Sequence, residues 1–191
     1  MKQLSLLHAH NSLALLKNSL VMPKLFFLRT ADCSGNQLLE VFHSTLRAGL
    51  STVLNVDLND DQWLQALLPV GEGGLQICSA QMLAPSAFLS SAALTSALQQ
   101  SIFPDSVNLL EAQSVASTET RWSSLSGSTR PANEEQHIQK SWDKPVTKNH
   151  QALVFSRAAG DVDQARLLAA ASPTLHVPRI ASVGLSCLKK P

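Results

Sequence analysis

Residues 37–50 read Gln-Leu-Leu-Glu-Val-Phe-His-Ser-Thr-Leu-Arg-Ala-Gly-Leu and carry the cleanest periodic pattern in the chain. Leu39, Phe42, Leu46 and Leu50 recur every three or four residues, so a helix would place all four on one face. The stretch therefore predicts an amphipathic α-helix. It is the strongest indication that the protein is mainly α-helical.

Segments on both sides of this helix carry weaker versions of the same pattern. Proline disfavours helix interiors, so Pro85 marks a point where one helix could break, and Pro145 separates two others. Residues 53–58 fit either a short strand or irregular structure. Further helices are expected over residues 3–20, 60–68, 79–100, 109–125, 133–142, 147–158 and 161–171.

These segments predict an irregular helical bundle with a looser second helical unit. Residues 1–103 contain the better patterns and are expected to hold the better-packed part. Residues 104–191 are expected to form a looser region, with some disorder allowed for, and residues 106–128 within it are rich in Ser and Thr. Residues 126–131, Ser-Gly-Ser-Thr-Arg-Pro, have the composition of a linker.

The composition narrows the class of protein. The chain has 191 residues, of which 45% are hydrophobic and 15% charged, which is too apolar for a disordered chain. No apolar run approaches the roughly 20 residues of a membrane-spanning helix. Three scattered cysteines do not form a disulfide framework. Without a secretory pattern at the N-terminus, the expected location is intracellular, in the cytoplasm or nucleus.

The formal net charge of +1 hides an uneven distribution. Residues 1–50 hold five basic and two acidic residues, residues 51–120 hold seven acidic and no basic residues, and residues 121–191 hold ten basic and five acidic residues. Such asymmetry can accompany a surface that faces nucleic acid, although ordinary surface variation also produces it.

Few motifs in the chain point to chemistry. Asp60-Asp61 could hold metal ions only on a strand–turn–strand hairpin, whereas Asn59 followed by Gln62 is typical of a capping box at a helix start. Cys33, Cys78 and Cys187 lack the paired spacing of metal ligands. The sequence therefore predicts no catalytic residues, no metal site and no cofactor.

Several short motifs, in this order and spacing, carry a family resemblance over roughly residues 3–172. Together they resemble reverse-transcriptase-like proteins of animal non-LTR retrotransposons, in the part C-terminal to the polymerase palm. The motifs lie at residues 15–18, 22–25, 28–30, 46–50, 60–64, 68–70, 73–75, 83–89, 139–143 and 165–173.

The resemblance implies that residues 1–103 correspond to the polymerase thumb, whose helices track the template–primer backbone, and to the helical connector that follows it. Four matching basic residues would then contact phosphates of an RNA/DNA hybrid: Lys17, Lys24, Arg29 and Arg47. The palm that holds the catalytic metals has no counterpart here, so the resemblance implies a truncated copy that is not an enzyme. After Pro173 the sequence departs from the family pattern.

Two alternatives stay open beside nucleic-acid binding. One is a helical module that binds another protein through an exposed apolar face, either the face of Leu39, Phe42 and Leu46 or the alanine-rich helix over 79–100. The other is a remnant without a selected function. The two binding hypotheses differ in salt dependence, because phosphate contacts weaken steeply with salt and apolar contacts do not.

Overall fold

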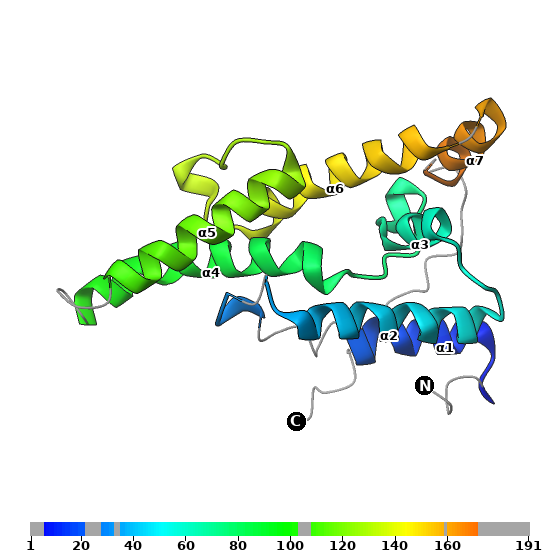
Figure 1. Cartoon of the computed structure of the whole chain (residues 1–191), viewed down its shortest axis with the longest axis horizontal. Helices are drawn as coiled ribbons and strands as arrows, with labels where there is room; N and C mark the ends of the chain where they lie inside the picture. Colours follow the sequence, from blue (N-terminus) through cyan, green and yellow to red (C-terminus); the bar gives the residue numbers. More distant parts are fainter. Residues whose placement is uncertain (1–5, 22–27, 33–34, 103–107, 159, 172–191) are drawn as a thin grey trace, which may run out of the picture.

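The computed structural model describes residues 6–21, 28–32, 35–102, 108–158 and 160–171. In this part of the chain it is mainly α-helical, as predicted, and contains no strand (Figure 1). Its α-helices are α1 (Ala9–Leu15), α2 (Gln37–Leu54), α3 (Asp60–Leu67), α4 (Ala80–Ile102), α5 (Asn108–Ser126), α6 (Gln139–Arg157) and α7 (Asp161–Ala171). Among the described residues, no helix combines the length and apolar character needed to cross a bilayer.

The opening stretch forms α2, whose ends are both set by asparagine. The Asn36 side chain accepts a hydrogen bond from the Leu38 backbone N–H, which satisfies a donor that the helix itself cannot pair. At the other end Asn55 adopts the left-handed conformation, with φ of 53°, and stops the helix. Residues 53 and 54 are therefore helical, and the possibility of a short strand over 53–58 was wrong.

Three other predicted segments differ in the structure. The first helix is shorter than 3–20, because α1 passes into a π-helical segment, η2 (Leu16–Val21). α4 runs unbroken through Pro85, and α6 runs unbroken through Pro145. A single α6 thus replaces the two helices expected over 133–142 and 147–158, and a 3-10 turn, η5 (Asn133–Glu135), precedes it.

Buried side chains form three clusters that link successive helices. The first joins α1, η2, α2, α3 and the N-terminal half of α4, and includes Leu39, Leu46 and Leu50. The second joins α4, α5 and α6 around Trp122 and Trp142. The third joins α3, α6 and α7 around Val154 and Leu167.

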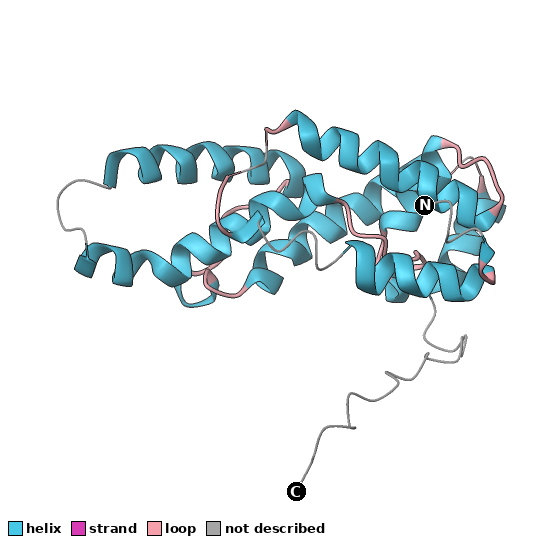
Figure 2. Ribbon diagram, turned by 90° about the horizontal axis from the view of Figure 1, so that it is seen from below, coloured by secondary structure: helices cyan, strands magenta, loops and turns pink. Residues whose placement is uncertain are grey.

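α4 contributes to the first and second clusters, so helices on both sides of residue 103 share buried contacts. Its C-terminal half extends with the start of α5 beyond the other helices (Figures 1 and 2). The division into units 1–103 and 104–191 stays a prediction.

Candidate nucleic-acid interface

The four basic residues implied by the family resemblance do not share one surface element. Lys17 lies in η2 and donates a hydrogen bond to Gln76 Oε1 at 2.9 Å. Arg29 Nη2 donates to Oε1 of Gln139, at the start of α6, at 2.8 Å. Lys24 lies outside the described residues. Lys17 and Arg29 therefore each connect segments distant in the sequence.

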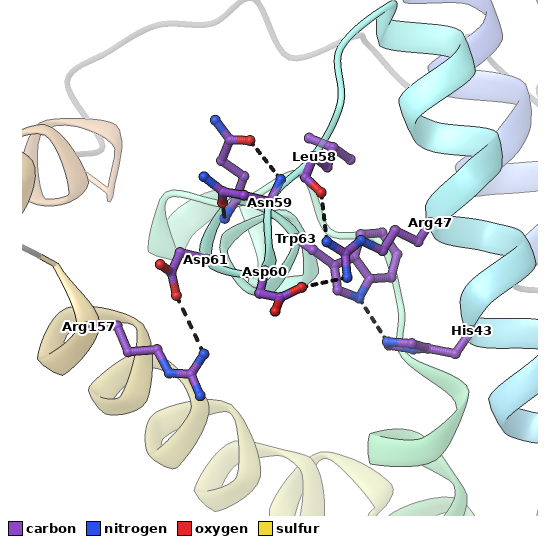
Figure 3. A network of polar contacts seen from close by, with 9 residues as sticks. His43, Arg47, Leu58, Asn59, Asp60, Asp61, Trp63 and Arg157 are labelled. Atoms are coloured by element: carbon purple, nitrogen blue, oxygen red, sulfur yellow. Dashed lines mark hydrogen bonds and ion pairs between the residues drawn. The ribbon is translucent and has the colours of Figure 1, made fainter.

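Arg47 is a structural tie between α2 and the loop that begins α3 (Figure 3). Its Nη1 forms an ion pair with Asp60 Oδ1 at 2.8 Å, and its Nη2 donates to the Leu58 carbonyl oxygen at 2.6 Å. The side chain is one-third exposed. Engagement at both nitrogens leaves Arg47 poorly placed to bind a phosphate without giving up these contacts.

The adjacent acids Asp60 and Asp61 lie at the start of α3, so the predicted capping box at a helix start is confirmed. The Asn59 side chain accepts a hydrogen bond from the Gln62 backbone N–H at 2.8 Å, and Gln62 Oε1 accepts one from the Asn59 backbone N–H at 3.1 Å. Asp61 points to Arg157 of α6, with 3.4 Å between Oδ1 and Nη1 (Figure 3). Both acids therefore lie in the first turn of α3, where negative charge is favourable, and each forms an ion pair with an arginine of another helix.

Below this loop, Trp63 and His43 join α3 to α2. Trp63 Nε1 donates to His43 Nε2 at 2.8 Å, and the rings meet edge to face with centroids 5.0 Å apart. Burial lowers the pKa of His43; Glu40 opposes this effect and Arg47 adds to it. A neutral imidazole is required, because Nε2 must keep its lone pair to accept the tryptophan N–H.

α6 carries a row of three lysines that were not among the predicted nucleic-acid contacts. Lys140, Lys144 and Lys148 are exposed and follow one another at four-residue intervals. In the described part of the chain, none of the three pairs with a carboxylate. Helical geometry places them on one face, with a rise of about 6 Å from each lysine to the next.

The opposite face of α6 anchors the helix in the protein. Trp142 is 1% exposed; its Nε1 donates to the Gln136 carbonyl at 2.7 Å, and its own carbonyl accepts from Trp122 Nε1 at 3.0 Å. Further along, His150 Nε2 lies 2.8 Å from the Leu64 carbonyl oxygen of α3. The lysine row is therefore presented by a helix held at several points along its length.

The sequence contains the signal for this row, but the expected helix boundaries concealed it. With one helix ending at residue 142 and the next beginning at 147, Lys144 fell between them and the three lysines shared no face. Only a helix that continues through Pro145 aligns them. Spacing by four among residues 140–148 was the available indication.

Beside the lysine row, two features could form a ligand site, a cluster of metal-binding side chains and a pocket, and only a pocket is found among the described residues. No group of three or more His, Cys, Asp or Glu side chains among them is arranged to hold a metal ion. A pocket of about 330 Å³ lies between α3, α6 and α7. Its arginines, Arg157 and Arg166, each already face an aspartate, Asp61 and Asp163 respectively.

Comparison with known proteins adds no relative: no family model, no curated protein and no solved structure matches the chain.

Proposed function

We propose that the protein binds the sugar–phosphate backbone of nucleic acid through the exposed face of α6. The observation that carries this proposal is the row of Lys140, Lys144 and Lys148, which has no carboxylate partner among the described residues. The role is accessory: lysines that contact phosphates fix a duplex in place without reading its sequence. The proposal assigns no catalytic step to the protein.

Three features of α6 support this role. The row is linear, as a phosphate strand is, and a lysine needs no fixed geometry to approach a phosphate. The helix is anchored on its opposite face, so binding does not require the helix itself to become ordered. The row also lies in residues 121–191, which carry twice as many basic as acidic residues.

The proposed role agrees with what the family resemblance implies, a thumb and connector derived from a retrotransposon reverse transcriptase. It moves the expected contacts to a different helix. Lys17, Lys24 and Arg29 stay the competing contacts that the family resemblance predicts, whereas Arg47 is assigned here to joining α2 and α3. An RNA/DNA hybrid is the first partner to test.

The test compares binding of a labelled RNA/DNA hybrid at about 50 and 200 mM salt. Three phosphate contacts predict a roughly 20- to 40-fold loss of affinity over this range, from a slope of about −0.7 to −0.9 per phosphate. The Lys140→Gln/Lys144→Gln/Lys148→Gln variant should bind more weakly and lose most of this salt dependence. Circular dichroism should show unchanged helicity, because all three side chains are exposed.

A matched control removes three positive charges elsewhere, at Lys17, Arg29 and Arg166, by substitution with Gln. It should bind nearly as well as the parent protein. Equal losses in both variants would show that only net charge matters and would overturn the α6 assignment. Loss in the control alone would favour the contacts that the family resemblance implies.

A further inference from the structure

One face of α4 carries a continuous pattern that changes from buried to exposed along the helix. Its positions follow intervals of four and three residues, the spacing of a helix-packing seam. They are Ala80, Ala84, Ala87, Ser91, Leu94, Leu98 and Ile102. Because these intervals average about 3.7 residues, close to the 3.6 residues of one helical turn, all seven lie along one side of the helix.

The first part of this face is covered by the protein itself. Ala80, Ala84 and Ala87 are 1%, 2% and 5% exposed and belong to the buried cluster that includes α2. The small side chains let the two helices approach closely. In this half of α4 the seam therefore packs against α2.

The second part of the face has large apolar side chains, which no helix among the described residues covers in this way. Leu94, Leu98 and Ile102 are 65%, 61% and 57% exposed. They lie on the half of α4 that extends, beside α5, past the other helices (Figures 1 and 2). A seam that continues with larger apolar residues onto a projecting helix is suited to receive a further helix.

The charge pattern favours a second copy of α4 as the partner helix. Residues 73–104 contain no Asp, Glu, Lys, Arg or His, so α4 has no charge to pair with a charged partner. Two copies of α4 can approach without like-charge repulsion and without desolvating an ion. The seam is also compatible with two-fold symmetry, since Leu98 is central and Leu94 and Ile102 lie four residues to either side.

We propose that the protein self-associates through this seam, with α4 of one copy antiparallel to α4 of a second copy. Leu98 meets Leu98 of the other copy at the two-fold axis, and each Leu94 packs against an Ile102. The contact buries six large side chains that are mostly exposed in the single chain. This inference is independent of nucleic-acid binding, because the lysine row lies on α6.

The test measures the mass of the full chain by sedimentation velocity between about 1 and 200 μM. The parent protein should convert from monomer to dimer in this range. Leu98→Glu, which places two carboxylates at the axis, should raise the dimer Kd at least about tenfold. Leu168→Glu is the matched control, because Leu168 is 62% exposed on α7 and lies outside the seam; its dimer should be unchanged.

A cross-linking experiment keeps the proposal falsifiable if Leu98→Glu impairs folding. Under mild oxidation Leu98→Cys should form a disulfide-linked dimer more rapidly than Leu168→Cys, and both variants contain the same native cysteines. Equal cross-linking, a parent protein that is monomeric at all concentrations, or a folded Leu98→Glu variant that still dimerises would each overturn the proposal.

Discussion

At the scale of single residues, Asp143 is the most perturbed acid in the described chain. It lies on α6, half-buried between this helix and α4, and burial raises the pKa of its carboxyl from 3.8 to about 6. Ser86, Gln139 and the Arg29 guanidinium act in the opposite direction but do not cancel the effect of burial. The folded protein therefore binds a proton at Asp143 more tightly than the unfolded chain does.

This pKa shift sets the sign of a pH dependence. Between about pH 4 and pH 6 the folded state holds more protons at Asp143, so its contribution to the free energy of unfolding falls as the pH rises. Asp143→Asn should remove that slope and stabilise the protein at pH 8 by about 1–3 kcal/mol, the upper end corresponding to the full pKa shift. Urea unfolding at pH 4.5 and pH 8 measures both quantities.

The reference in this experiment is the parent protein at the same two pH values, so other titrating groups cancel in the difference. His43 has a lowered pKa and acts in the opposite sense, since its stabilising contribution is lost as the pH falls. If Asp143→Asn changes stability equally at both pH values, the carboxyl does not titrate as described.

At the scale of elements, the loop between α2 and α3 is bounded by two asparagines with different tasks. Asn59 caps α3 through its side chain, whereas Asn55 ends α2 through its left-handed backbone. Asn59→Ala removes an acceptor for the Gln62 N–H and should lower the free energy of unfolding by about 1 kcal/mol. Asn55→Gly should leave it unchanged or raise it slightly, because glycine adopts positive φ without strain.

Chemical denaturation of the two variants beside the parent protein decides the assignment. Equal destabilisation by both substitutions would mean that the loop depends on asparagine side chains at each end, contrary to the cap geometry.

The capping box is one feature that local sequence predicted correctly. It depends only on residues three apart, so no distant contact is needed to form it.

The prolines illustrate the opposite case. Local rules predicted a possible break at Pro85 and a separation at Pro145, because proline removes one backbone hydrogen bond of a helix. Both helices continue, since residues before and after each proline are buried in the clusters: Ala84 and Ala87 in α4, Trp142 and Val146 in α6. Burial on both sides of each proline outweighs the lost bond.

At the scale of the whole molecule, α4 and Trp142 connect the two predicted units. Trp122 and Trp142 meet edge to face with centroids 4.9 Å apart, in the cluster that joins α4, α5 and α6. Trp142→Phe keeps most of the volume but leaves the Gln136 carbonyl without its donor. It should lower the stability of the entire fold by about 1–3 kcal/mol.

Thermal unfolding of the parent protein and of Trp142→Phe, followed by helical circular dichroism and by a fluorescent label on an exposed residue of α2, tests this expectation. A single transition that shifts in both signals would show that the helices before and after residue 103 unfold together. Two separate transitions, with only the helical signal changed, would instead support the predicted division at residue 103.

The arrangement of the helices determines which of the predicted binding faces are exposed. The face of Leu39, Phe42 and Leu46 is occupied by the protein's own core, so it does not serve as a docking surface. In the alanine-rich helix, only the C-terminal half leaves large apolar residues exposed. Periodicity identified both faces as apolar, but which of them another helix of the same chain covers depends on how the bundle assembles.

The sequence by itself determined the helical class, most helix positions, the start of α3 and the shortage of catalytic motifs, because these depend on composition and on residues within one or two helical turns. The tertiary structure decided that α4 and α6 continue through proline, that Arg47 is tied to Asp60 and Leu58, and that three lysines align on α6. These outcomes depend on burial and on partners far away in the sequence, which no local pattern contains.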